Sequence, residues 1–409
     1  MQDPADGPDT ALAAQYESLP YPARDPRDEA RRLFIGSPSH LREIDHWVFG
    51  ATRPASQPLR ILVAGGGTGD ATVMLAEQLR QAGRPGEVTH LDRSEASLAI
   101  ARARIAARGL AVRFLQHSLL DLPQSGLGPF DYIDCCGVLH HLPDPAAGLA
   151  ALCSVLAPGG GLGLMVYAPH GRTGIYMMQD ALRLLAPAGQ PVPARLETAR
   201  RVLRHLRPEH WLALNRSVTD HVAGGDAGIF DVLLNPRDRP FALPDFLALL
   251  QGAGLAPTCL LEPIRYDPAA YLPDPKLRRA AAALPWAQQA ALAESLSGTM
   301  STHVAYAVRA NARPAARDPF APDSVPVARE LPGPEIAARL RPDGTYPFVA
   351  EALSLAIPLP RLAGPLLRRV DGARPVAALL EGLGPQAEPA WRETYTRLNA
   401  ANLLLLAAR

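Results

Sequence analysis

The sequence predicts an α/β protein whose main domain is a doubly wound, mostly parallel sheet. From Leu59 onward, short apolar runs alternate with longer stretches rich in Ala, Leu and Arg. This alternation is typical of a sheet that helices cover on both faces. The strand-like runs are apolar on both faces, as expected for strands buried between two layers of helices. A glycine-rich turn, "GGGTGD" at 65–70, joins the first predicted strand to the first predicted helix.

The composition indicates a folded protein without a charged binding surface of one sign. The chain has 409 residues, of which 48% are hydrophobic and 20% charged, so two or three domains of about 100–200 residues can each bury a core. Lys+Arg number 41 and Asp+Glu 40, a net charge of +1, which argues against a nucleic-acid partner. The acidic N-terminus has no signal-peptide pattern, and no apolar run reaches the length of about 18 residues that spans a membrane. We expect a cytoplasmic protein with no membrane partner.

The four cysteines indicate no metal or redox site. Cys135, Cys136, Cys153 and Cys259 form no CxxC pair. Adjacent Cys135 and Cys136 lie in an apolar run, where buried free thiols are the simplest interpretation.

The expected elements follow one another along the chain. Residues 1–57 form a helical cap, in which "SPSHLREIDHWVFG" is a helix ending at Gly50. The main domain covers 58–311, with insertions near 170–240 and 268–298 that we expect to form a lid. Predicted strands are 59–65, 87–92, 111–116, 130–139, 161–168, 256–264 and 302–310, and predicted helices are 70–83, 94–109, 146–160 and 243–254. A Pro/Ala/Arg-rich linker at 312–329 leads to a small, mainly helical domain at 330–409.

The glycines of the first turn stand where α/β sheets bind ligands. Gly65, Gly67 and Gly69 follow a strand and precede a helix, at the carboxyl edge of the predicted sheet. Glycine allows positive φ and close approach of the backbone to a ligand, although a tight structural turn has the same pattern. Asp92 ends the second strand and can accept hydrogen bonds from both ribose hydroxyls, which disfavours NADP. NAD or FAD and S-adenosylmethionine remain as ligands.

The later stretch "GPFDYIDCCGVLHHLPDPAAGLAALCSVLAPGGGLGLMVYA" resembles the second half of a class I S-adenosylmethionine-dependent methyltransferase. A strand of the form F-D-x-I ends in "VLHHL", and a helix leads to the L-x-P-G-G turn at Leu156–Gly160. With "APTCLLEPI" and "THVAYAVRA" as sixth and seventh strands, the resemblance covers about 58–311. It implies a Rossmann-like seven-stranded sheet with S-adenosylmethionine as cofactor.

The resemblance also implies roles for individual residues. The glycine loop would lie against the methionine end of the cofactor, Asp92 would hold the ribose, and Arg93 would lie beside the adenine. Ser118 and Leu119 would bracket the adenine. Cys136 and Gly137, at the tip of the fourth strand, would line the methyl end.

Two positions depart from the family pattern. Val63 stands where an acidic residue is usual, two places before Gly65, and Asp70 is either its substitute or a cap of the following helix. Ser118 replaces an aspartate that is frequent at the adenine site.

Candidate catalytic and substrate residues surround this predicted site. His140 and His141 follow the fourth strand and are candidate bases, although "HHL" is common in the family whatever the substrate. Tyr16 and Tyr21 are expected to fold over the cofactor cleft, or to serve packing only. His170, Arg172 and Tyr176 follow the fifth strand at the mouth.

Two of these candidates have a plainer alternative. Arg172 either pairs with a substrate carboxylate or phosphate or is an ordinary surface arginine. His221 lies near Asp220 and Asp226 in the first insertion, where we expect a hydrogen-bonded lid network and no metal site, because the spacing matches no ligand pattern.

The C-terminal region resembles winged-helix-like modules related to the PqqD peptide-chaperone family. "LLRRVDGARPVAALL" forms a helix, an Asp-Gly turn at Asp371–Gly372, and a second helix. The resemblance implies peptide binding by strand addition, or a role only in dimerisation into a homodimer or as a scaffold.

These observations predict an S-adenosylmethionine-dependent methyltransferase that acts on a small-molecule acceptor, at O, N or S, in a lidded cleft. The alternative is methylation of a peptide or protein side chain delivered by the C-terminal domain. RNA ranks third, because no basic, aromatic-interleaved segment is present. A binder of S-adenosylmethionine without catalytic activity is the alternative of a different class.

Overall fold

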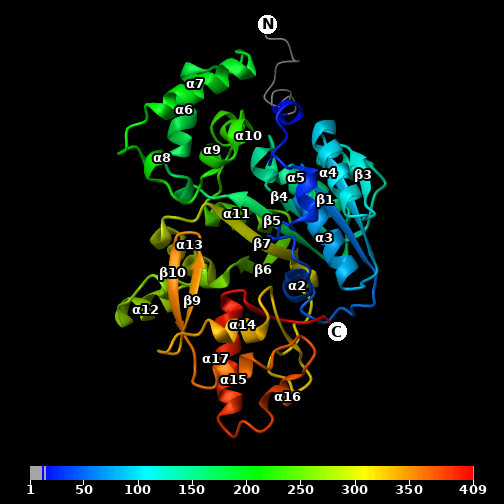
Figure 1. Cartoon of the computed structure of the whole chain (residues 1–409), viewed down its shortest axis with the longest axis vertical. Helices are drawn as coiled ribbons and strands as arrows, with labels where there is room; N and C mark the ends of the chain where they lie inside the picture. Colours follow the sequence, from blue (N-terminus) through cyan, green and yellow to red (C-terminus); the bar gives the residue numbers. More distant parts are fainter. Residues whose placement is uncertain (1–11, 13–14, 409) are drawn as a thin grey trace.

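The computed structural model describes Leu12 and residues 15–408, and its centre is a seven-stranded sheet (Figure 1). The strand order is β3-β2-β1-β4-β5-β7-β6. β1 to β5 pair in parallel, and β7 runs antiparallel to β5 and β6. The predicted Rossmann-like, seven-stranded sheet is confirmed. Its strands are β1 Leu59–Ala64, β2 Gly86–Asp92, β3 Arg113–Gln116, β4 Phe130–Cys136, β5 Leu156–Tyr167, β6 Leu255–Leu261 and β7 Thr302–Arg309.

Helices cover both faces of the sheet, because its strands are apolar on both sides. On one face, α5 (Pro145–Ser154), α11 (Leu243–Gly252) and α13 (Trp286–Ser297) pack in one core with β4 and β5. On the other face, α3 (Asp70–Gln81), α4 (Glu95–Ala107) and a helical turn at 41–48 pack over β1, β2 and β7. The sheet therefore has a hydrophobic core on each of its two faces.

The start of β5 differs from the prediction. The helix predicted to 160 ends at Ser154, and β5 begins at Leu156. Pro158 cannot continue a helix, and Gly159 has a φ of +73°. Leu156 instead pairs with Phe130 of β4, so the "LAPGG" turn forms the irregular first part of the strand.

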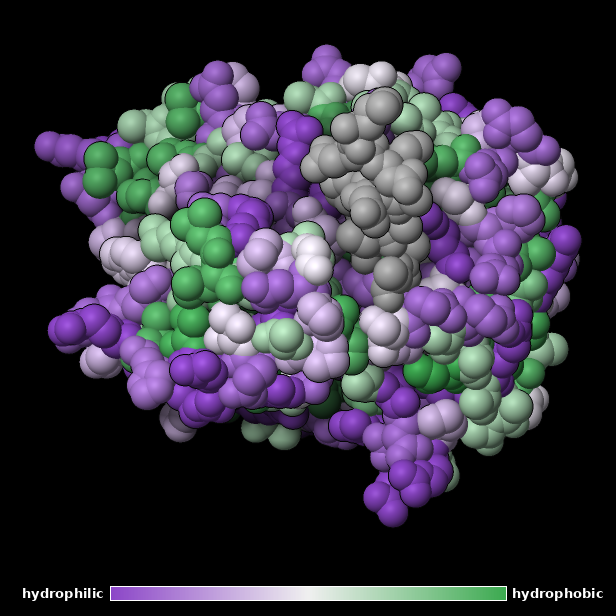
Figure 2. All heavy atoms as spheres, turned by 90° about the horizontal axis from the view of Figure 1, so that it is seen from above, coloured by the Kyte–Doolittle hydropathy of each residue, from purple (hydrophilic) through white to green (hydrophobic). Residues whose placement is uncertain are grey.

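The segment after β5 forms a helical lid at one end of the molecule (Figure 1). It has a core of its own, which includes Ile175, Leu196 and Phe230. Its outer surface also carries exposed hydrophobic side chains, including Leu184 and Trp211, among charged ones (Figure 2). The lid elements are α6 Ile175–Leu185, α7 Val192–Arg204, α8 Trp211–Leu214, α9 Asp220–Ala223, α10 Gly225–Ile229 and a π-helical turn Phe230–Leu234.

The second insertion, between β6 and β7, is helical as expected. It contains α12 (Pro275–Ala282) and α13. Among the described residues, no helix is both long and apolar enough to cross a membrane.

The N-terminal part forms only short helical segments where it is described. After a turn at 15–18 come a 3-10 helix, Pro26–Ala30, then α2 (Leu41–Glu43) and a π-helical turn, Ile44–Val48. The predicted helix before Gly50 is thus present, and Gly50 has a φ of +59°. Between 19 and 40 the chain has little regular structure besides the 3-10 helix, and its charged side chains bond both to the main domain and to one another, as in the Arg27–Asp25 pair.

The C-terminal region packs its own core around Trp391 and contains two small sheets. β8 (Pro326–Ala328) pairs with β11 (Leu404–Leu406), and β9 (Thr345–Ala350) pairs with β10 (Leu353–Pro358). The Asp371–Gly372 turn lies between two helices, and Asp371 Oδ1 accepts hydrogen bonds from the backbone N–H groups of residues 373 and 374. The relation of this region to PqqD-like modules stays a prediction. Its helices are α14 Gly333–Ala338, α15 Ala363–Leu367, α16 Val376–Leu380 and α17 Ala387–Ala400.

Glu43 joins three parts of the chain through one buried carboxylate. It is fully buried and accepts hydrogen bonds from Tyr306 Oη of β7 (2.6 Å) and from Asn402 Nδ2 near the C-terminus (2.6 Å). It also pairs with Arg329 and accepts from Ser37 Oγ. The C-terminal region is therefore fastened to the sheet through a charge that water cannot solvate.

Replacing Glu43 with Ala is expected to lower the free energy of unfolding by about 3–5 kcal/mol, because Arg329 and Asn402 lose a buried partner. The matched control is Glu330→Ala, since Glu330 pairs with the same arginine but is 41% exposed; it is expected to change stability by less than about 1 kcal/mol. Urea denaturation measures both. Equal losses in the two variants contradict the assignment.

One row of side chains crosses the sheet beside the glycine loop. Val63 of β1 pairs in register with His90 of β2 and Asp134 of β4, so the three side chains share a face. Asp134 is buried, and its Oδ2 accepts a hydrogen bond from Ser39 Oγ (2.7 Å). Its Oδ1 has no partner among the described residues. Burial raises the pKa of Asp134 to about 7.

This pKa predicts a stability that falls as pH rises. From about pH 4, where a carboxyl ionises in the unfolded chain, to about 7, the folded state keeps a proton that the unfolded state has lost. The free energy of unfolding then decreases by up to about 1.4 kcal/mol for each pH unit. Asp134→Asn retains an acceptor for Ser39 and removes the proton. As the pH rises across this window, the free energy of unfolding of Asp134→Asn, measured with urea, should increase relative to that of the wild type. A difference between the two proteins that does not change with pH contradicts the assignment.

Candidate functional site

The glycine loop is shaped by neighbours that leave no room for side chains. Gly65 and Gly66 donate backbone hydrogen bonds to the carbonyl oxygen of Leu91 (2.8 and 3.1 Å). Gly65, Gly67 and Gly69 have φ angles of +71°, +52° and +98°. A Cβ at Gly66 would lie 2.4 Å from the His90 ring. The backbone of β1 is thus turned sharply at the carboxyl edge of the sheet, where it can approach a ligand closely.

Asp92, at the end of β2, holds this loop to the start of α4. Its Oδ2 accepts the Gly67 N–H (2.7 Å), and its Oδ1 accepts the Ser94 N–H (2.9 Å). Burial raises the pKa of Asp92. Each carboxylate oxygen keeps a second lone pair, so the geometry fits two hydroxyl donors of a ribose. Arg93 follows at an exposed position.

The other residues predicted for the cofactor lie at the ends of β3 and β4. Ser118 caps the 3-10 helix Leu119–Gln124 by accepting the N–H of residue 120, and Leu119 is part of the core. Gly137 has a φ of +79° and donates to the Met165 carbonyl oxygen of β5. Cys136 ends β4, where burial raises the pKa of its thiol. These positions and the glycine loop line one edge of the sheet.

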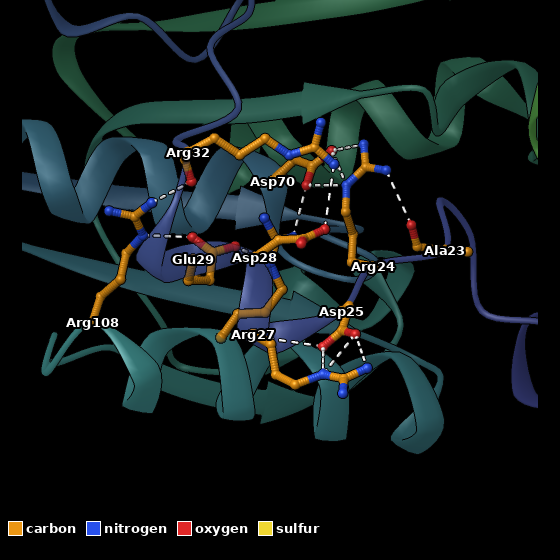
Figure 3. A network of polar contacts seen from close by, with 10 residues as sticks. Ala23, Arg24, Asp25, Arg27, Asp28, Glu29, Arg32, Asp70 and Arg108 are labelled. Atoms are coloured by element: carbon orange, nitrogen blue, oxygen red, sulfur yellow. Dashed lines mark hydrogen bonds and ion pairs between the residues drawn. The ribbon is translucent and has the colours of Figure 1, made fainter.

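Asp70 fastens the N-terminal segment to α3 (Figure 3). Its carboxylate pairs with Arg24 (2.6 Å) and with the fully buried Arg104 (2.7 Å). Burial raises the pKa of Asp70, but these two arginines hold it below its usual value. The interpretation of Asp70 as a helix cap is wrong, because Gly69 occupies the N-cap position without a side-chain hydrogen bond. The sequence also suggested Asp70 as a substitute for the acidic residue that is usual at the position of Val63. In the structure the Asp70 carboxylate is already paired with two arginines.

The segment from 15 to 24 lies across the glycine loop and the start of α4. Thr68 Oγ1 donates to the Pro22 carbonyl oxygen (2.8 Å), and Ser94 Oγ donates to Glu17 (2.9 Å). The carbonyl oxygen of Tyr21 lies 3.1 Å from where a Cβ of Gly67 would stand. Tyr21 therefore lies over the loop.

The same segment reaches the lid through Tyr16. Tyr16 Oη donates to Asp231 Oδ1 (3.1 Å) in the π-helical turn of the lid. Asp231 is buried, and its Oδ2 has no partner among the described residues. Burial raises the pKa of both groups, so Tyr16 remains a donor. Asp231 was not predicted from the sequence.

His140 and His141 lie beside this contact at the end of β4. The His140 ring centroid is 3.9 Å from that of Tyr167, and neither ring nitrogen has a partner among the described residues. Burial, together with the charges of His141 and Arg172, lowers the pKa of His140, which keeps it neutral. His141 Nδ1 lies 2.6 Å from the Arg237 carbonyl oxygen. Because a carbonyl only accepts, Nδ1 carries the proton and Nε2 of a neutral His141 is an acceptor.

Arg172 is buried rather than exposed at the surface. Its guanidinium lies 3.6 Å over the Tyr167 ring, donates to Tyr176 Oη (3.0 Å) and pairs with Asp238 (3.1 Å). The alternative of a surface arginine is therefore wrong. Through these contacts Arg172 links the lid to the end of β5, and Asp238 neutralises its charge.

The remaining predicted residues lie apart from this arrangement. His170 is exposed, and His221 is half-buried in α9. Asp226 pairs with Arg200 of α7. Within the described residues, no group of three His, Cys, Asp or Glu side chains is placed to hold a metal ion.

The buried polar side chains between the lid and the sheet are called the lid cluster below. Its members are Tyr16, His140, His141, Tyr167, Arg172, Asp231 and Asp238. Asp231 and Asp238 come from "FDVLLNPRD". Polar residues in an otherwise apolar stretch were the only signal that the sequence gave for them.

Comparison with known proteins finds relatives for the main domain. Residues 62–162 match a family model described as a methyltransferase domain. An uncharacterized protein of Synechococcus sp. is 34% identical over 258 residues, covering 60% of this chain and 58% of the relative. The ubiquinone biosynthesis O-methyltransferase of Thiobacillus denitrificans is 32% identical over 152 residues, covering 37% of this chain and 60% of the relative. The chain thus spans less than two thirds of either relative.

The fold also matches solved structures. PKMT2 from Rickettsia typhi superimposes with a TM-score of 0.62 at 15% identity, covering 90% of this chain and 75% of that one. Its complex with AdoHcy gives a TM-score of 0.53 at 16% identity, covering 71% and 56%. At this identity the likeness concerns the fold alone.

Proposed function

The chain contains a class I S-adenosylmethionine-dependent methyltransferase domain, and from this premise we propose that it transfers a methyl group to a small-molecule acceptor held under the lid. The observation that carries the proposal is the position of the lid cluster. Tyr16 connects it to the segment that crosses the glycine loop, so the acceptor side and the cofactor side meet at one edge of the sheet.

The residues at the cofactor side fit the nucleoside and the methionine. Asp92 would hold the ribose hydroxyls, and the glycine loop would lie against the methionyl part. The loop has no room for side chains of its own, because Cβ atoms at Gly65 and Gly66 would clash with Val138 and His90. When bound, S-adenosylmethionine supplies an electrophilic methyl group on a sulfur that is a good leaving group. The chain must then align the acceptor and exclude water.

The lid cluster is suited to both tasks. Its side chains are buried or half-buried where the lid helices and the N-terminal segment meet the sheet, which limits the access of water to this region. Nε2 of His141 can accept a proton from the acceptor, because the Arg237 carbonyl oxygen fixes the proton of the ring on Nδ1. The neutral His140 and the paired Arg172 hold the Tyr167 ring in place.

The alternative acceptor is a peptide or protein side chain. It is favoured by the C-terminal region, in which β9 and β10 form a two-stranded sheet, so that each strand has one edge without a partner strand, and peptides bind other proteins by adding a strand at such an edge. Release of S-adenosylhomocysteine, measured with the full-length protein over pooled metabolites and pooled peptides, distinguishes the two acceptors.

Asp92→Ala is expected to weaken S-adenosylhomocysteine binding about 10- to 100-fold, because charge-assisted hydrogen bonds to the ribose are lost. Isothermal titration calorimetry measures the affinity. Glu95→Ala, an exposed carboxylate on the first turn of the neighbouring α4, is the control and should bind normally. If Asp92→Ala binds S-adenosylhomocysteine with unchanged affinity, the proposal that Asp92 holds the ribose is wrong.

His141→Gln is expected to lower kcat by at least about 100-fold, with S-adenosylhomocysteine affinity unchanged, because the proton acceptor is lost. His170→Gln, on the exposed turn after β5, serves as the control. If both variants keep the wild-type kcat, His141 is not the base.

A further inference from the structure

We infer that the atom methylated is an amine nitrogen, which the lid cluster binds as an ammonium group before it loses a proton. This inference rests on the proposed function and deepens it, because the resemblance leaves the acceptor atom open and the O-methyltransferase relative matches only 37% of this chain. It follows from the unpartnered polar atoms in and around the lid cluster and from the charge of the cluster.

The unpartnered atoms of the lid cluster are mainly hydrogen-bond acceptors. Asp231 Oδ2 and Asp238 Oδ1 are buried carboxylate oxygens without a partner among the described residues. The amide oxygen Gln15 Oε1, next to Tyr16 in the chain, is a third buried acceptor without a partner. The unpartnered side-chain donors nearby are Asn235 Nδ2 and the one N–H of the neutral His140 ring, neither of whose nitrogens has a partner among the described residues. Since buried polar groups are normally hydrogen-bonded, the missing partner is a group rich in N–H or O–H donors.

The charge of the cluster selects among such groups. Arg172 pairs with Asp238 through the carboxylate oxygen Oδ2 and neutralises its charge. The same oxygen also accepts a hydrogen bond from Gln179 Nε2 (3.1 Å). Asp231 forms no ion pair with an arginine or lysine in the part of the chain that the structure describes, and its one hydrogen bond comes from neutral Tyr16. A buried carboxylate in this position is stabilised by a cation.

An alkylammonium group meets both requirements. It carries one positive charge and three N–H donors, whereas a phenol, alcohol or thiol offers one donor and no charge. An acceptor that carries a carboxylate or phosphate would add negative charge beside Asp231. Aromatic rings complete the environment: His141 lies with its ring centroid 6.5 Å from that of Tyr16 and 5.8 Å from that of Tyr167, and tyrosine faces attract ammonium groups.

The reaction then balances without a further co-reactant. The ammonium gives one proton to His141 Nε2, which frees the nitrogen lone pair. That pair forms the N–C bond to the methyl carbon while the C–S bond breaks, and its electrons stay on sulfur. The products are the methylated amine and S-adenosylhomocysteine, and the proton leaves His141 for solvent. Asp231 holds the ammonium group before it loses the proton and the methylated ammonium product afterwards, and the nitrogen is neutral only while it attacks the methyl carbon.

The experiment uses the full-length protein with S-adenosylmethionine and four acceptor sets: small primary amines and diamines, a lysine-containing peptide, catechols and phenols, and thiols. S-adenosylhomocysteine release is measured for each. The expected result is turnover with an amine set, and the comparison of free amines with the peptide identifies the source of the amine. Turnover of phenols or thiols without turnover of amines overturns the inference, and so does an absence of turnover in a protein that binds S-adenosylhomocysteine.

Asp231→Asn tests the role of the carboxylate. It should lower kcat/KM for the amine by at least about 100-fold and leave S-adenosylhomocysteine affinity unchanged. The control is Asp226→Asn, an exposed carboxylate of the same lid that pairs with Arg200. Thermal unfolding of both variants verifies the fold. Wild-type kcat/KM in Asp231→Asn overturns the inference.

A binding measurement is independent of turnover. In the presence of S-adenosylhomocysteine, calorimetry should detect butylammonium binding that Asp231→Asn weakens at least about 10-fold, and much weaker binding of neutral butanol. Equal affinity for both probes overturns the inference. A wild-type protein that fails to bind S-adenosylhomocysteine overturns the proposed function itself, which separates the two failures.

Discussion

Four buried or half-buried carboxylates constrain the candidate site, because a carboxylate that is removed from water needs partners within the protein. Asp92 is held by two backbone N–H groups and Asp70 by two arginines. Asp134 has one hydroxyl donor, from Ser39, and Asp231 has one, from Tyr16. The carboxylates with full sets of partners shape the cofactor side. Asp231 is left incompletely paired under the lid, where the acceptor is proposed to bind.

The N-terminal segment links the two sides. Arg24 and Thr68 fasten it to the glycine loop and α3, while Tyr16 reaches Asp231 of the lid. Because this segment is bonded both to the glycine loop and to the lid, the position of the lid depends on that of the loop. The paired Arg172 serves a similar purpose from the end of β5, since it joins Tyr167 to Asp238. The site therefore depends on contacts between residues far apart in the sequence.

Most of the fold was predictable from the sequence, because strand-like and helix-like periodicity are local properties. The glycine loop and Asp92 were predictable as well, since a strand-to-helix turn and a strand end fix where they lie. The start of β5 was missed because Pro158 and Gly159 suggested a turn, whereas pairing with β4 extends the strand.

The lid was harder to predict from the sequence. Asp231 lies in a π-helical turn and Asp238 in the irregular segment that follows it, neither carries a recognised motif, and only tertiary packing brings them to Tyr16 and Arg172. The burial of Arg172 was missed for the same reason, because its partner is 66 residues away. Sequence patterns pointed to the glycine loop and to His140, His141 and Arg172, and the structure was required to bring these together with Asp231 and Asp238.

The central claim is that the cofactor side and the lid cluster form one site connected by the N-terminal segment. Hydrogen–deuterium exchange with and without S-adenosylhomocysteine tests it most directly, because amide protection reports local opening along the chain. Bound S-adenosylhomocysteine is expected to slow exchange at 65–70, at 15–24 and at 225–238 together. Protection confined to 65–70 and the end of β2, with the lid unchanged, would contradict it.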